Sequence, residues 1–175
     1  MNDVKSGPGP KQPAEPGLQS PRPAQMPMPM AASVTMAPPP HALDVRRNAY
    51  RPGLAAKYLE GRVEAEHFVE GVPAQVMRAS VPLRGKPDYT RGFDTEALYG
   101  EALTIFDESD GWAWVQLKRD QYVGYIPADS VSRNVLVPTH RIQALGTFIY
   151  PEPNFKTPPL LHLPLNSVVT VRASD

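Results

Sequence analysis

Residues 97–131 constrain the fold more than any other stretch, because they contain three short alternating segments separated by tight turns. The segments span residues 98–106, 112–117 and 122–126. Small polar residues with a glycine separate the first two, and Pro127 ends the third because proline donates no hydrogen bond to a sheet. Three such strands cannot bury both faces of a flat sheet. We therefore expect an all-β fold in which the sheet curls into a small barrel.

The middle segment is the most informative, because its two faces differ. Ala113, Val115 and Leu117 lie on one face, while Trp112 and Trp114 lie on the other. If the first set fills the barrel interior, both tryptophans point outward and need a cover. Either the chain before the barrel or a second barrel covers them, or they form a shallow aromatic groove that binds a peptide. The tyrosines near such a groove are Tyr89, Tyr99, Tyr122 and Tyr125.

The chain before the barrel divides into a tail and a connecting segment. Residues 1–40 hold 11 of the 22 prolines and almost no isoleucine, leucine or aromatic residue, so we expect a disordered, Pro-rich tail. A second interpretation makes this tail a ligand for an SH3 groove. Residues 41–73 predict a short helical segment, with Pro52 in its first turn and Gly61 as its stop. Residues 62–71 are compatible with helix or strand.

The rest of the chain contains an internal sequence repeat. Residues 74–131 form the first predicted barrel, in which residues 85–96 make a long turn-rich loop. Residues 138–175 look like the same barrel starting again, because an offset of 66 residues places Pro87 on Pro153 and the letters LTI on VTV. At this offset the second copy is expected to end about 20 residues beyond the last residue of the sequence. We therefore expect an incomplete second barrel and a chain that is a fragment.

Composition excludes several functions. The 18 basic residues balance the 18 acidic ones, so no basic field is available for nucleic acid or an anionic membrane. Cysteine is absent, which removes disulfides, thiolate metal sites and a cysteine nucleophile from these residues. The run DESDG at residues 107–111 lacks the calcium-loop pattern and favours a hairpin turn. We expect no cofactor, no metal, no membrane span and no secretory signal, and therefore a cytoplasmic location.

The strand GWAWV followed by GYIPADSV resembles the bacterial SH3 (SH3b) pattern, which closes with a 3₁₀ turn. From about Leu43 to the end, the chain resembles the N-terminal half of NlpC/P60-family cell-wall peptidases of the dipeptidyl-peptidase VI type. The resemblance implies that residues 41–73 pack across the barrels. It also implies a papain-like Cys-His domain after the SH3b units, and the family's catalytic motif is missing from these residues.

The resemblance also implies a function for the aromatic region. In these peptidases, acidic and tyrosine side chains of the first SH3b unit recognise the free amino end of a peptidoglycan stem peptide. Glu101 and Tyr122 are the best candidates here, with Asp94 and Glu96 as rivals, because a carboxylate beside an aromatic face suits an ammonium group. A solvated glutamate at a strand end is the structural alternative for Glu101.

We therefore expect the SH3b substrate-recognition region of a cysteine peptidase of the γ-D-glutamyl-diamino-acid endopeptidase class. The catalytic domain is missing, so this chain is expected to bind a peptidoglycan-derived peptide without cutting it. The predicted ligand-binding residues are Glu101, Tyr122, Trp112, Trp114, Tyr99 and Tyr125, and no residue is predicted to be catalytic. The alternative is a free-standing SH3-like adaptor that binds a Pro-rich or cell-wall peptide.

Overall fold

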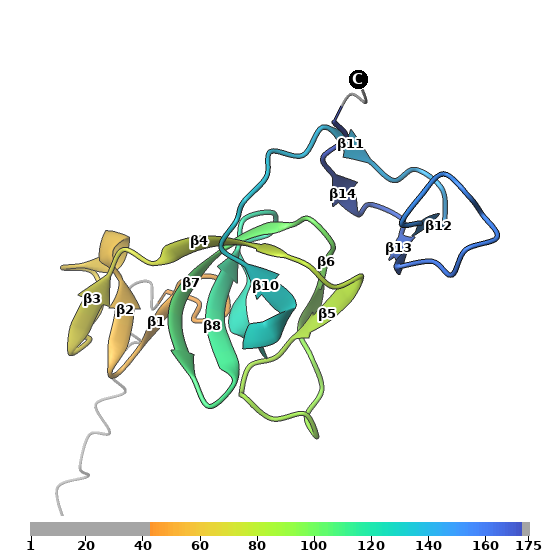
Figure 1. The fold of residues 1–175 in the computed structure, drawn as a ribbon. Coiled ribbons are helices and arrows are strands. Elements are labelled where there is room, and N and C mark those ends of the chain that lie inside the picture. Colours follow the sequence, from red (N-terminus) through yellow and green to blue (C-terminus); the bar gives the residue numbers. More distant parts are fainter. Residues whose placement is uncertain (1–42, 173–175) are drawn as a thin grey trace, which may run out of the picture. The chain divides into compact units, whose positions relative to one another are not determined.

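The computed structural model describes residues 43–172 (Figure 1). Strands dominate these residues, and the helices among them are two single-turn 3₁₀ helices, η1 (Lys57–Leu59) and η2 (Ala128–Ser130). The predicted all-β, SH3-like fold is thereby confirmed. None of the helices in residues 43–172 has the length or the hydrophobicity to cross a bilayer. The Pro-rich tail predicted for residues 1–40 lies outside the described residues.

The segment before the barrel forms a small sheet in place of the longer helix expected there. Its strands are β1 (Tyr50–Arg51), β2 (Leu54–Ala56) and β3 (His67–Val69), in the order β1-β2-β3 with β2 and β3 parallel. The helical part is limited to η1, because the residues just before it are drawn into a strand whose two alanines are fully buried. The glycine after η1, Gly61, has φ +75° and stops the helix as expected.

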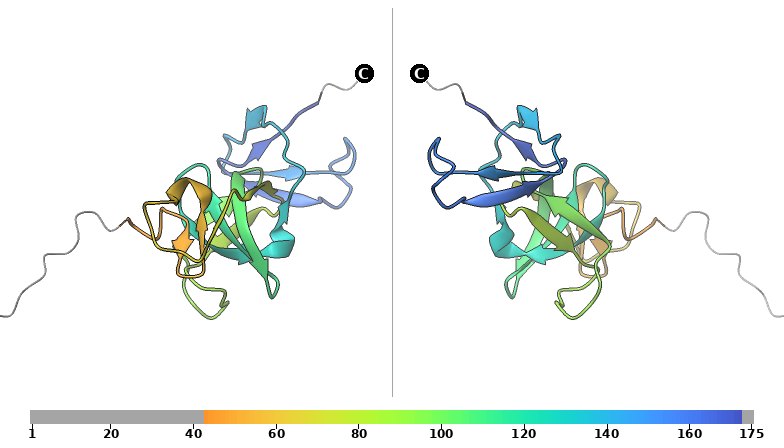
Figure 2. Two further views of the ribbon diagram at one scale, coloured as in Figure 1. Left: turned by 90° about the vertical axis from the view of Figure 1, so that its left-hand side faces the viewer. Right: turned by 90° about the vertical axis from the view of Figure 1, so that its right-hand side faces the viewer.

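The first barrel combines a five-stranded sheet with a hairpin. The sheet has the order β10-β4-β7-β8-β9, and β5 pairs with β6 in the hairpin (Figures 1 and 2). Two backbone hydrogen bonds between Arg84 and Tyr125, 2.7 and 3.0 Å long, join the end of β5 to β9 and close the barrel. The strands are β4 (Val72–Val76), β5 (Ser80–Leu83), β6 (Thr95–Leu98), β7 (Ala102–Ser109), β8 (Trp112–Leu117), β9 (Val123–Pro127) and β10 (Val131–Ser132).

Turn chemistry explains where the observed strands differ from the expected ones. The prediction of one strand over residues 98–106 is wrong in extent, because Gly100 has φ +81° and separates β6 from β7. At the other end, β7 continues to Ser109. Only Asp110 and Gly111 form the turn to β8, and both have positive φ, as a type I′ hairpin turn requires.

Strand β8 is buried on both faces, because each face belongs to a different core. The face that carries Val115 and Leu117 belongs to the barrel interior. The face that carries Trp114 belongs to a second core, which the segment before the barrel forms against the outside of the sheet. The second core contains Ala49, Ala56, Leu59, Phe106, Trp114 and Val123.

Four further strands repeat the first part of the barrel. They are β11 (His140–Arg141), β12 (Gly146–Ile149), β13 (Leu161–Pro164) and β14 (Val168–Val169). The pairing of β12 with β13 copies that of β5 with β6 at an offset of 66 residues, and the pairing of β11 with β14 copies that of β4 with β7 at the same offset. The sequence repeat therefore corresponds to a repeat of strand register.

Candidate functional site

Trp114 lies beneath the segment that precedes the barrel. Its side chain is only 4% exposed and packs against Phe106, with the two ring centroids 5.8 Å apart. Tyr125 on β9 lies directly opposite Trp114 on β8. Of the two interpretations for the outward-facing tryptophans, the covered one therefore describes Trp114, and residues 43–69 provide the cover.

The ring of Trp114 already holds an internal cation. The guanidinium carbon of Arg51 lies 4.5 Å from the ring centroid, and Nη1 of the same arginine donates a hydrogen bond of 2.7 Å to the Tyr125 hydroxyl. Nη2 forms an ion pair with Asp107. Burial lowers the pKa of Arg51, but the hydrogen bonds to Asp107 and Tyr125 outweigh burial, so the pKa rises. The aromatic face is therefore suited to cations.

A pocket of about 180 Å³ opens beside this arginine. Trp114, Tyr125 and Tyr50 provide its aromatic wall, while Asp94, Arg46 and Arg51 provide charge. Its lining comes from three separate parts of the chain: the segment before the barrel, the long loop after β5, and strands β8 and β9. The fold thus places charged and aromatic groups together that are up to 79 residues apart in the sequence, as 125 − 46 shows for Tyr125 and Arg46.

Besides Arg51, two further charged groups line this pocket, and they differ in their partners. Arg46 is paired with Asp44 through a contact of 3.0 Å, and that hydrogen bond raises the pKa of Arg46. Asp94 is exposed, and no cationic side chain within residues 43–172 lies within 4.0 Å of its carboxylate. The Asp94 carboxylate faces Gly85, which also lines the pocket. Asp94 therefore has no ion-pair partner among residues 43–172, although after the Asp44 contact its charge also helps to raise the pKa of Arg46.

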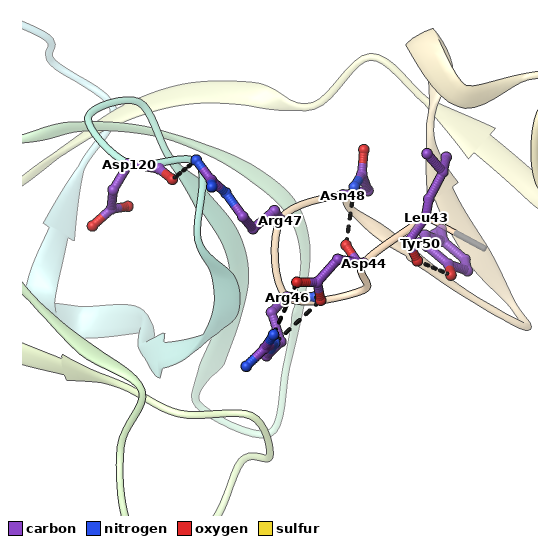
Figure 3. A network of polar contacts seen from close by, with 7 residues as sticks. All are labelled: Leu43, Asp44, Arg46, Arg47, Asn48, Tyr50 and Asp120. Atoms are coloured by element: carbon purple, nitrogen blue, oxygen red, sulfur yellow. Dashed lines mark hydrogen bonds and ion pairs between the residues drawn. The ribbon is translucent and has the colours of Figure 1, made fainter. Parts of the chain in front are cut away.

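The segment before the barrel forms one side of the pocket, and a network of polar contacts stabilises it (Figure 3). Arg47 donates a hydrogen bond of 3.1 Å to the backbone carbonyl of Asp120, in the loop between β8 and β9. The Tyr50 hydroxyl donates one of 2.7 Å to the carbonyl of Leu43, and the Asn48 side chain donates one of 2.9 Å to the carbonyl of Asp44. These contacts hold the pocket's aromatic and cationic residues against the barrel.

Trp112 lies at a different place from Trp114, although both point to the same side of β8. It is 8% exposed, and its ring centroid lies 4.4 Å from that of Tyr89 in the long loop. Pro127 is its partner on β9. Tyr89 itself is 65% exposed, so its ring packs on Trp112 from the solvent side.

Glu101 is buried near the second set of strands. It is 8% exposed, and one carboxylate oxygen forms an ion pair of 2.6 Å with Arg119, while the other is buried without a hydrogen-bond partner among residues 43–172. Burial raises the pKa of Glu101, and the charge of Arg119 opposes this only in part. The neighbouring Tyr99 lines a separate cavity of about 80 Å³ together with Val168. Neither residue lines the pocket beside Asp94.

Tyr122 is half-buried against the barrel core, and its backbone N–H donates a hydrogen bond of 3.1 Å to Asp120. The six predicted ligand-binding residues are therefore divided among separate places, and only Trp114 and Tyr125 share a pocket. Ligand binding by the six stays a prediction. Sequence reasoning missed Tyr50, Arg46 and Arg51, because no spacing in the sequence indicates which residues before the barrel will contact β8 and β9.

Residues 83–131 match the family described as the bacterial dipeptidyl-peptidase SH3 domain. No curated protein matches the chain. The matched residues run from the end of β5 to β10 and include Asp94, Trp114 and Tyr125. The barrel that carries one side of the pocket is therefore a bacterial SH3 (SH3b) domain.

Proposed function

We propose that this chain is the SH3b substrate-recognition region of an NlpC/P60-type cysteine peptidase that acts on peptidoglycan stem peptides, of the γ-D-glutamyl-diamino-acid endopeptidase class. The match of residues 83–131 to a dipeptidyl-peptidase SH3 domain supports this assignment. The sequence contains no cysteine, so the nucleophile would belong to a papain-like domain outside these 175 residues. The chain itself binds a peptide without cleaving it, and the cytoplasm is the compartment we propose for it.

The observation that carries the proposal is that the Asp94 carboxylate, which has no ion-pair partner within 4.0 Å among residues 43–172, lines one pocket with the side chains of Trp114 and Tyr125. A free amino terminus carries one compact positive charge with three N–H donors. A carboxylate on one side and an aromatic face on the other are the groups that stabilise such a cation. The Arg51 guanidinium already lies 4.5 Å from the Trp114 centroid, so the peptide's amino group has to bind on the Asp94 side of the pocket.

Asp94 is a better acceptor for an ammonium group than Glu101. Glu101 is buried, carries a raised pKa and is paired with Arg119, so a ligand would have to displace an internal ion pair to reach it. Asp94 is exposed and faces the pocket. We therefore assign the amine-binding role to Asp94, one of the rivals to Glu101 in the sequence, with Tyr125 as its aromatic partner.

The test is a titration of the full chain with L-Ala-γ-D-Glu-diaminopimelate, followed by NMR signals of the Trp114 indole and the Tyr125 ring. We expect saturable shifts of both, and no shifts with the peptide acetylated at its alanine, which lacks the amino-terminal charge but keeps the ammonium group of diaminopimelate. Asp94→Asn should weaken binding at least about tenfold, because a charge-assisted hydrogen bond is lost.

Asp110→Asn is the matched control, since it removes the same charge from the hairpin turn, where asparagine also tolerates positive φ. This variant should bind as the unmodified chain does. Equal binding of the acetylated peptide would contradict recognition of the amino end and favour the adaptor function. Cleavage of the peptide by this chain alone would contradict its assignment as non-catalytic.

A further inference from the structure

Two arginines line the pocket that contains Asp94, and they differ in how far their guanidinium groups are occupied. In Arg51, Nη1 donates a hydrogen bond to the Tyr125 hydroxyl and Nη2 donates one to Asp107. The face of this guanidinium lies over the Trp114 ring. Arg51 therefore has internal partners on both of its terminal nitrogens and on its face.

Arg46 has guanidinium donors that no acceptor within residues 43–172 occupies. Its Nε and Nη2 donate hydrogen bonds of 3.2 and 3.0 Å to the two carboxylate oxygens of Asp44, which fills one edge of the group (Figure 3). A guanidinium carries five N–H donors, so both donors of Nη1 and one of Nη2 are left. They form a second edge, whose fork matches the two oxygens of a carboxylate. The pairing with Asp44 also fixes the guanidinium, so little side-chain freedom is lost when a ligand binds.

The pocket therefore presents opposite charges to a single ligand. Asp94 supplies a carboxylate and Arg46 an unoccupied guanidinium edge, and both line the same volume of about 180 Å³. The two side chains also interact, because the charge of Asp94 adds to the rise in the pKa of Arg46 that the hydrogen bond and the charge of Asp44 mainly cause. Such an arrangement is complementary to a ligand that carries an ammonium group and a carboxylate a short distance apart.

We propose that the free edge of the Arg46 guanidinium binds the α-carboxylate of the ligand's second residue, and that the pocket thereby selects γ-linked peptides. This inference rests on the proposed function, in which Asp94 binds the amino end of L-Ala-γ-D-Glu-diaminopimelate. The γ-linkage leaves the α-carboxylate of the second residue free, within about 7 Å of the amino group. In an ordinary α-linked peptide the same position is a neutral amide, which a guanidinium binds less strongly.

The test compares three peptides by calorimetric titration of the full chain. The first is L-Ala-γ-D-Glu-diaminopimelate, the second is the same peptide amidated at the α-carboxyl group of D-Glu, and the third is its α-linked isomer, which has the same net charge. We expect the second and third peptides to bind the unmodified chain at least about fivefold more weakly, because a charge-assisted contact is lost. Arg46→Gln should bind the first two peptides equally, because glutamine has no guanidinium edge.

Arg62→Gln is the matched control, because Arg62 also lies before the barrel, is exposed and forms no ion pair within residues 43–172. It should keep the difference between the peptides. Arg46→Gln should still bind the peptide acetylated at its alanine more weakly than the free peptide, because Asp94 is unchanged.

The outcomes separate this inference from the function on which it rests. Equal binding of the amidated and free peptides by the unmodified chain, with the dependence on the amino group retained, would overturn the inference and leave the proposed function standing. A difference between these two peptides that persists in Arg46→Gln would also overturn it, because another group would then bind the carboxylate. Binding that does not depend on the amino group in the unmodified chain would overturn both.

Discussion

Gly100 lies where the first barrel packs closely against Val168 of the repeat, and its replacement by alanine is a sharp test of that contact. Its φ is +81°, which an L-residue with a side chain adopts at a cost of about 1 kcal/mol. A Cβ at this position would lie 2.0 Å from the carbonyl oxygen of Val168 and 2.8 Å from one of its methyl groups. Because a backbone oxygen is the closest atom, no side-chain rotation relieves the clash.

The clash has to be resolved by moving β14 away. That movement breaks the 3.0 Å hydrogen bond from the Val168 N–H to the Tyr99 carbonyl, which contributes about 1 kcal/mol. Together with the cost of the positive φ, we expect Gly100→Ala to lower the free energy of unfolding by about 2 kcal/mol. The Val168 amide should also exchange with solvent at least about five times faster, because the contact that protects it is lost.

Gly111→Ala separates the two causes. Gly111 has φ +77°, nearly the same backbone conformation, but a Cβ added to it would meet no other atom within 4 Å. This control should lose about 1 kcal/mol in urea unfolding and leave the exchange rate of the Val168 amide unchanged. Equal losses for the two variants, or unchanged exchange of Val168 in Gly100→Ala, would refute the contact between β14 and the first barrel.

Two further variants test the charged groups. Arg51→Met keeps the length of the side chain but removes the cation over Trp114 and the partner of Asp107. It should lower the free energy of unfolding by about 1 kcal/mol in urea melts and change the Trp114 fluorescence, whereas unchanged values would contradict a stabilising cation–π contact. For Glu101, burial raises the pKa in the folded state, so its contribution to stability is present below the ordinary pKa of glutamate and is lost as the pH rises through the folded value. Glu101→Gln should therefore become more stable relative to the unmodified chain as the pH rises from about 4 to about 7, and a difference that does not depend on pH would contradict the raised pKa.

Sequence patterns predicted the strands of the barrel correctly where a turn signal and an alternation of apolar residues indicate the same boundary. The strand at residues 112–117 has its expected bounds, because a hairpin turn with positive φ precedes it and its apolar residues alternate. The repeat offset of 66 residues, visible in a few matched letters, reproduces the pairing of β12 with β13. Where the sequence predicted a helix after Pro52, the structure has a single 3₁₀ turn. Burial of the alanines in β2 outweighed their helix propensity.

The pocket could not be predicted in the same way, because its residues meet only through the contact between the segment before the barrel and the outside of β8. On an isolated barrel, the tryptophan face of β8 would form an exposed groove. Here Arg51 and the second core cover Trp114, so a ligand can reach the aromatic wall only at the seam between that segment and the loop that carries Asp94. Binding at this seam requires the polar network of residues 43–50 to stay in place. A chain that begins after this network should therefore keep the barrel's strand pairing and lose its affinity for the peptide.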